Sequence, residues 1–117
     1  MSGEEVVADN PKGAEYAGHY GDFLALYDRK SDKTEILSMN SENRGSQIAQ
    51  INGRVSVIVS FKDLLICNKS VCKQIDGRFE AFGVLDFNPT SATVLAGYVV
   101  LGVACNTNIR IYEYSGG

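Results

Sequence analysis

Residues 46–61 read SQIAQINGRVSVIVSF, and this stretch carries the clearest structural signal in the chain. From residue 54 to residue 61 apolar and polar side chains alternate, which predicts a strand with one buried face. The apolar members of that face are Val55, Val57, Val59 and Phe61. The pair Asn52-Gly53 is typical of a type I′ turn, in which both central residues need positive φ. We therefore predict a β-hairpin that joins 46–51 to 54–61 through this turn.

The same β pattern extends outward along the chain in both directions. We predict further strands over 23–27, 34–39, 64–67, 71–75, 78–87 and 109–114. Lys62-Asp63 and Asp76-Gly77 are expected to form tight turns. The apolar stretch 92–105 would be about 46 Å long if fully extended, which is too long for one straight strand here. We therefore expect a break or bulge within that stretch, at Gly97 or Gly102.

These elements predict an all-β, mainly antiparallel fold. The expected architecture is a small β-sandwich or a partly closed barrel of about eight or nine short strands. An α+β domain with one missed helix is the alternative. Residues 1–21, which contain Pro11 and several glycines, are predicted to form a loose N-terminal arm, and residues 22–117 a single β domain. The cluster Tyr16, His19 and Tyr20 at the end of the arm is expected to be pinned on that domain.

Composition limits the possible functions. The chain has 117 residues, of which 44% are hydrophobic and 21% charged, as expected for one globular domain. A net charge of -3 argues against a strongly basic protein that packages nucleic acid. Three cysteines are an odd number, and the first residues show no secretory signal pattern. Both features predict a cytoplasmic, reduced setting.

The motifs of catalytic and metal sites are weak or missing. The spacing Cys67-x4-Cys72 is poor for zinc, and the one histidine, His19, lies in the predicted arm. No glycine-rich phosphate loop occurs. The apolar run 93–105 is too short for a membrane-spanning helix, which needs about 20 residues. We therefore expect no enzymatic activity, no cofactor, no metal site and no membrane association.

The last third of the chain has an unusual apolar load. In residues 93–105 both faces of the predicted strands carry apolar side chains, so an extra layer must cover one of them. A missed helix, the N-terminal arm or another subunit could supply that layer. The leading hypothesis is a non-enzymatic protein-protein interaction or structural assembly module that forms a homo-oligomer. The interface candidates are Val94, Tyr98, Val100, Ile111 and Tyr112.

Single-stranded nucleic acid is the alternative partner. An OB-like barrel combines basic rims with aromatic side chains on which bases stack. The candidates for this role are Arg44, Arg54, Lys62, Lys73 and Arg78. The net acidic charge opposes binding to phosphates, so we rank this alternative second.

One segment resembles a known structural unit. The apolar run Tyr98–Cys105, the turn Asn106–Asn108 and the Ile-x-Ile-Tyr strand Ile109–Tyr112 resemble the inner part of a β-propeller blade. The pattern is also that of a general antiparallel hairpin. A propeller needs at least about four blades of about 40 residues, so the chain is too short to close one alone. No internal repeat is evident, and we assign the sequence to no family.

Overall fold

The computed structural model describes residues 13–40, 45–103 and 109–113. These residues form eleven strands, with antiparallel pairing throughout, and contain no helix. The predicted all-β, antiparallel class is therefore confirmed. Since the described residues include no helix, none of them belongs to a helix able to cross a membrane.

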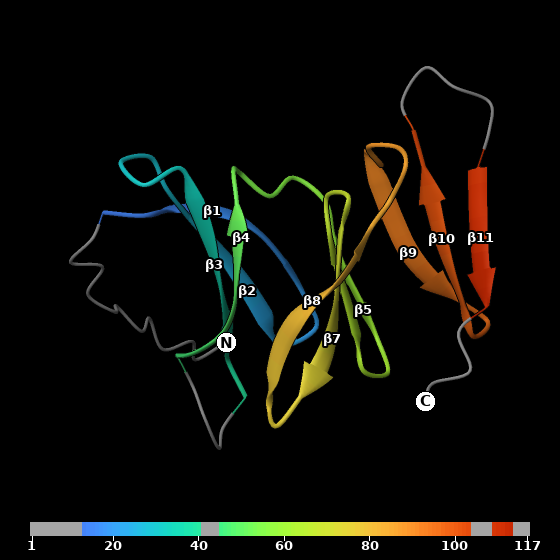
Figure 1. The fold of residues 1–117 in the computed structure, drawn as a ribbon, viewed down its shortest axis with the longest axis horizontal. Coiled ribbons are helices and arrows are strands. Elements are labelled where there is room, and N and C mark those ends of the chain that lie inside the picture. Colours follow the sequence, from blue (N-terminus) through green and yellow to red (C-terminus); the bar gives the residue numbers. More distant parts are fainter. Residues whose placement is uncertain (1–12, 41–44, 104–108, 114–117) are drawn as a thin grey trace, which may run out of the picture.

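The strands form three separate sheets in chain order (Figure 1). The first sheet contains β1 (Glu15–Tyr20), β2 (Phe23–Asp28), β3 (Lys33–Ser38) and β4 (Ser46–Asn52); the second contains β5 (Ile58–Phe61), β6 (Leu64–Cys67), β7 (Ser70–Ile75) and β8 (Arg78–Val84); the third contains β9 (Ser91–Leu95), β10 (Tyr98–Gly102) and β11 (Ile109–Glu113). Every strand pairs only with its neighbours in sequence, so each sheet is a simple meander. The predicted sandwich or barrel therefore needs refinement, because the strands are divided among three open sheets.

The sheets pack face to face around two apolar cores. The first core joins the first and second sheets and includes Ala25, Ile36 and Leu65. The second core joins the second and third sheets and includes Ile66 and Val99. All four residues of β6 are buried, because its alternate side chains enter opposite cores. The second sheet is therefore the middle layer of three, with β5 beside both β1 and β9.

The predicted hairpin at Asn52-Gly53 is wrong. Strand β4 ends at Asn52 and pairs with β3, while residues 54–57 cross to the second sheet. Gly53 has a φ of 82°, whereas Asn52 is not in the positive region that a type I′ turn requires. The crossing is held by Thr34, whose Oγ1 donates to the Gly53 carbonyl at 2.7 Å and accepts from the Val55 amide at 3.0 Å. Val55, Val57 and Val59 are buried as expected, but Phe61 is half-buried, and Val55 and Val59 lie in different cores instead of on one strand face.

Other turn predictions are confirmed. Asp76-Gly77 joins β7 to β8 with φ values of 53° and 80°. The expected break in the apolar stretch 92–105 is a turn at Ala96-Gly97, with φ values of 50° and 82°. Both turns have the two positive φ values of type I′ geometry.

The end of the predicted N-terminal arm is part of the first sheet. Strand β1 covers residues 15–20 and pairs along its length with β2, with a bulge between Tyr16 and Gly18. Ala17 packs against the first core and Tyr20 against the second. These buried contacts explain why residues in the arm's glycine-rich context are ordered as a strand. Residues 1–12 of the predicted arm lie outside the described residues.

Candidate protein interface

The third sheet has one covered face and one exposed apolar face. In β10, Val99 and Leu101 are 3% and 0% exposed and point toward the second sheet. Tyr98 and Val100 alternate with them and therefore point to the opposite side. Strand pairing places three further apolar side chains on that side. We call this set the C-terminal face: Leu95, Tyr98, Val100, Ile109 and Ile111.

The C-terminal face carries apolar side chains on all three strands of the third sheet. Leu95, Ile109 and Ile111 are 66%, 61% and 58% exposed, and the central Val100 is half-buried between its neighbours. The polar side chains on the same face are Ser91 and Thr93 of β9 and Glu113 at the end of β11. Contiguous exposed apolar patches of this kind are uncommon on proteins that remain monomeric and are typical of interaction sites.

The structure divides the five interface candidates between the two faces of the third sheet. Tyr98, Val100 and Ile111 belong to the C-terminal face. Val94 and Tyr112 both pair with Val99 and so lie on the face toward the second sheet. Val94 packs against the second core, and Tyr112 borders a cavity of about 170 Å³ beside it.

Two members of the C-terminal face, Leu95 and Ile109, were not among the candidates predicted from the sequence. A two-residue turn makes the residues on either side of it cross-strand partners, and such partners share a face. Applied to the Ala96-Gly97 turn, this rule pairs Leu95 with Tyr98, as the structure shows. Ile109 pairs with Gly102, which could not be inferred because the length of the loop before β11 does not fix its register.

No protein-family model matches this sequence, and no curated protein matches it. Among solved structures, the chain is similar to the computationally designed Ika4 protein, with a TM-score of 0.52 and 8% sequence identity. The match covers 82% of this chain and 62% of the Ika4 chain. At this identity the similarity concerns the fold alone.

Three of the basic residues considered for nucleic acid belong to the second sheet and its turns, and a fourth lies in the crossing before it. Lys62 lies over the Phe61 ring and Lys73 over the Phe82 ring, both in the second sheet. Arg78 begins β8, where it is exposed. Arg54 lies elsewhere, in the crossing that follows the first sheet, and Arg44 is outside the described residues. The structure thus places Lys62, Lys73 and Arg78 at one end of the second sheet, and Arg54 apart from them beside Glu15 and Tyr27.

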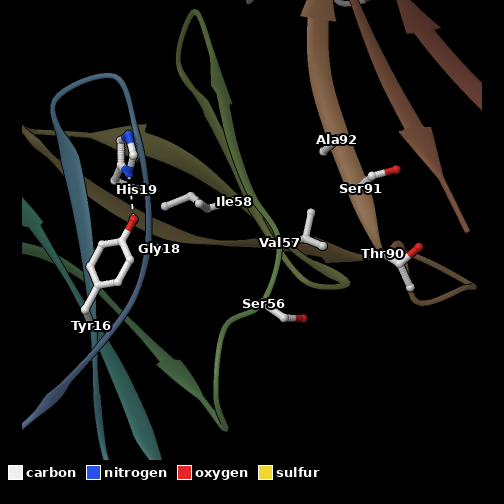
Figure 2. Close-up of a pocket in the computed structure, with 9 residues that line it drawn as sticks. All are labelled: Tyr16, Gly18, His19, Ser56, Val57, Ile58, Thr90, Ser91 and Ala92. Carbon is white, nitrogen blue, oxygen red and sulfur yellow. Dashed lines mark hydrogen bonds between the residues drawn. The ribbon is translucent and has the colours of Figure 1, made fainter. Parts of the chain in front are cut away.

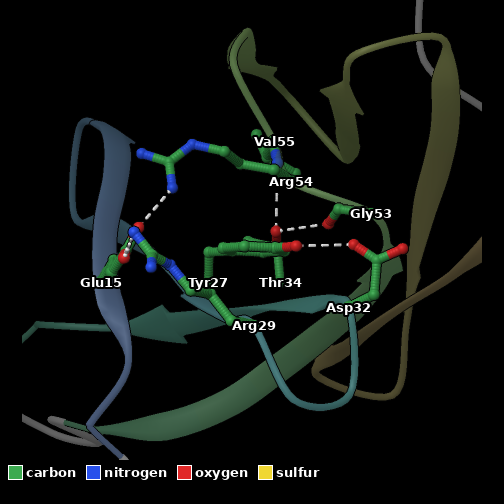
Figure 3. A network of polar contacts seen from close by, with 8 residues as sticks. All are labelled: Glu15, Tyr27, Arg29, Asp32, Thr34, Gly53, Arg54 and Val55. Carbon is green, nitrogen blue, oxygen red and sulfur yellow. Dashed lines mark hydrogen bonds and ion pairs between the residues drawn. The ribbon is translucent and has the colours of Figure 1, made fainter.

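Arg54 belongs to a polar network that fastens β1 to the crossing between sheets (Figure 3). Its guanidinium is 2.7 Å from the Glu15 carboxylate and lies over the Tyr27 ring. Arg29 contacts the other Glu15 oxygen at 2.5 Å. The hydrogen bond from Arg54, aided by the charge of Arg29, holds the pKa of Glu15 below its ordinary value. Tyr27 donates to Asp32 at 2.7 Å, which raises the pKa of the tyrosine.

A shallow cavity of about 330 Å³ lies where the three sheets meet (Figure 2). Tyr16 and His19 border it on one side and Thr90 and Ser91 on the other. The Tyr16 hydroxyl is 2.8 Å from His19 Nδ1, so these two polar groups are already bonded to each other. Within the described ranges, no group of three or more His, Cys, Asp or Glu side chains could hold a metal ion.

The described cysteines are packing residues. Cys67 and Cys72 are free thiols buried in the first core. Burial raises the pKa of both thiols, so they stay protonated near neutral pH. A protonated, buried thiol is a poor nucleophile and metal ligand. Cys105 lies outside the described residues.

Proposed function

We propose that this protein is a non-enzymatic, protein-binding module that self-associates through the C-terminal face. One observation carries the proposal: the face that each earlier sheet turns to the next is buried, and the corresponding face of the third sheet is not. The first sheet buries Ala25 and Ile36 there, and the second buries Val59 and Ile66. In the third sheet, Val100 holds the position that corresponds to Ala25 and Ile66. No sheet among the described residues covers it.

The apolar face contributes substantially to the binding free energy of a specific contact. Complete burial of a Leu, Ile or Val side chain contributes about 1.5–3 kcal/mol. Micromolar affinity requires a net binding free energy of about 8 kcal/mol, after the costs of association have been met. The side chains of the C-terminal face supply part of this free energy, and a micromolar contact also requires apolar burial on the opposing surface.

The cysteines support a cytoplasmic location for this module. Two of the three are free and buried in the first core, where they pack as small apolar side chains. Reduced thiols of this kind are typical of proteins made in reducing compartments. We propose that the module works in the cytoplasm, with a second copy of itself as its partner.

Light scattering of the complete chain at about 1 to 100 μM tests the proposal. We expect a molar mass that rises above that of one chain with concentration. Ile111→Asp places an unpaired charge in the contact and should keep the protein monomeric. Because Ile111 is exposed on an edge strand, this variant should remain folded.

Ile75→Asp is the matched control. Ile75 is also an exposed isoleucine, at 51%, but it lies on β7 of the second sheet and outside the C-terminal face. The control should self-associate as strongly as the unmodified protein. An unmodified chain that remains monomeric at 100 μM would contradict the proposed function.

A further inference from the structure

We infer that the C-terminal face binds the outer face of the first sheet on a second copy, so that two copies close head to tail into a ring of six sheets. This inference rests on the proposed self-association and adds the identity of the opposing surface. That surface, called the N-terminal face, consists of Tyr16, Leu24, Leu26 and Leu37.

Strand pairing in the first sheet defines the N-terminal face. Leu24 pairs with Leu37, and Leu26 pairs with Tyr16, so these four side chains share one side of the sheet. Ala25, between the two β2 leucines, points the other way into the first core. The three leucines are half-buried and belong to neither core of the described residues, and Tyr16 is 60% exposed.

The three sheets contain one repeated hairpin, which the sequence alone did not reveal. Residues 20–26 read YGDFLAL, residues 61–67 read FKDLLIC and residues 95–101 read LAGYVVL. Each segment ends a sheet's first strand, turns in two residues and enters its second strand. The first turn residue is left-handed in all three, with φ of 57° at Gly21, 55° at Lys62 and 50° at Ala96.

The side chains of the apolar run after each turn alternate between the same two directions in every sheet. Its second and fourth residues point toward the preceding sheet: Leu65 and Cys67 do so in the second sheet, and Val99 and Leu101 in the third. Its third residue points toward the following sheet, as Ala25 does in the first sheet and Ile66 in the second. The side chains left over are Leu24 and Leu26 at one end of the series and Tyr98 and Val100 at the other.

The two leftover surfaces are thus the two halves of the sheet-to-sheet contact that the chain already makes twice. The N-terminal face is the side of the first sheet that corresponds to the sides by which the second and third sheets contact the sheet before them. The C-terminal face is the side of the third sheet that corresponds to the sides by which the first and second sheets contact the sheet after them. Contact between two C-terminal faces would instead pack two equivalent sides of the sheet together. Neither contact between the described sheets within the chain has that arrangement. A head-to-tail contact between copies therefore continues the packing that the fold itself uses.

The number of sheets in each chain indicates how many copies would form a closed ring. A head-to-tail contact forms a closed ring when the rotation between units closes, and an open fibre when it does not. Closed radial arrangements of small antiparallel sheets have about four to eight members. Each chain supplies three sheets, so the multiple that falls in this range is six, given by two copies. The first strands β1, β5 and β9, which border the shared cavity, would then face the centre of the ring.

Variants on the two faces test the inference by light scattering and sedimentation. The unmodified chain should reach twice the mass of one chain and stop there. Leu26→Asp on the N-terminal face should be monomeric, as Ile111→Asp is on the C-terminal face. Tyr16→Asp, at a more exposed position, repeats the test on the N-terminal face if Leu26→Asp fails to fold.

The outcomes separate this inference from the proposed function. If Ile111→Asp is monomeric while folded Tyr16→Asp still forms dimers, the chain self-associates but the head-to-tail contact is wrong. Mass that keeps growing with concentration would show an open fibre and overturn the closed ring. A monomeric unmodified chain would overturn both proposals.

Discussion

The second and third sheets are built from similar residues but lie in different surroundings. Strand β6 has the sequence LLIC and is buried on both faces, whereas β10 has YVVLG and is buried on one. Ile66 and Val100 hold corresponding positions, yet Ile66 is buried in the second core and Val100 belongs to an exposed patch. The difference shows that a strand with apolar side chains on both faces requires two covering layers. The strand's sequence does not show which elements form those layers.

Truncation of leucines in the two sheets should show the largest contrast. Leu65 is fully buried between the first and second sheets, so Leu65→Ala should lower the free energy of unfolding by about 2–5 kcal/mol. Leu95 is 66% exposed on the C-terminal face, so Leu95→Ala should change it by less than about 0.5 kcal/mol in dilute protein. Urea denaturation at about 1 μM measures both values. Equal losses would mean that the C-terminal face is covered within the single chain.

The crossings between sheets give the second contrast. Thr34 is 0% exposed, and its hydroxyl bonds both Gly53 and Val55 in the crossing from the first sheet to the second. Thr34→Val leaves these buried backbone groups without that partner and should cost about 1–3 kcal/mol of unfolding free energy. Thr34→Ser keeps the hydroxyl and should retain most of the stability lost in Thr34→Val.

Thr90 in the next crossing provides the comparison for Thr34. It is exposed, and its hydroxyl is 3.5 Å from the Gly102 carbonyl. Because water can replace such a bond, Thr90→Val should cost less than Thr34→Val in the same denaturation experiment. A larger cost at Thr90 would show that the second crossing, and not the first, is the more tightly held.

The smallest expected effect concerns acid stability at the first sheet. The pKa of Glu15 is lowered from its ordinary value of 4.5, chiefly by the hydrogen bond from Arg54. A lowered folded-state pKa stabilises the fold above pH 4.5, and this contribution is lost as the pH falls through the folded-state value. Glu15→Gln should therefore reduce the loss of stability between neutral and acid pH, measured by thermal unfolding. An unchanged pH profile would show that the exposed ion pairs of Glu15 contribute nothing measurable.

Much of the local structure could be predicted because it depends on neighbouring residues. Alternation identified Val55, Val57 and Val59 as buried, and the turns at Asp76-Gly77 and Gly97 followed from residues that accept positive φ. The Asn52-Gly53 hairpin failed for a tertiary reason. Thr34, far away in the sequence, forms hydrogen bonds with Gly53 and Val55, where the chain crosses to the second sheet.

The candidate site could be located only in part. The apolar load of the C-terminal strands was visible in the sequence and pointed to Tyr98, Val100 and Ile111. Alternation and the Ala96-Gly97 turn separate Tyr98 from Val94, but no local pattern shows which of the two sides the second sheet covers. The repeat of three hairpins is not visible in the sequence, because its positions share apolar character and turn geometry and not residue identity.

The sequence by itself determined that this chain is an antiparallel β protein, where most of its turns lie and which segment carries excess apolar surface. Only the tertiary structure decided that the strands divide into three stacked meanders, with one apolar face left exposed at the third. The physical reason is the range of the interactions. Alternation and turn geometry act between residues adjacent in sequence, whereas burial of a sheet face depends on which other sheet packs against it.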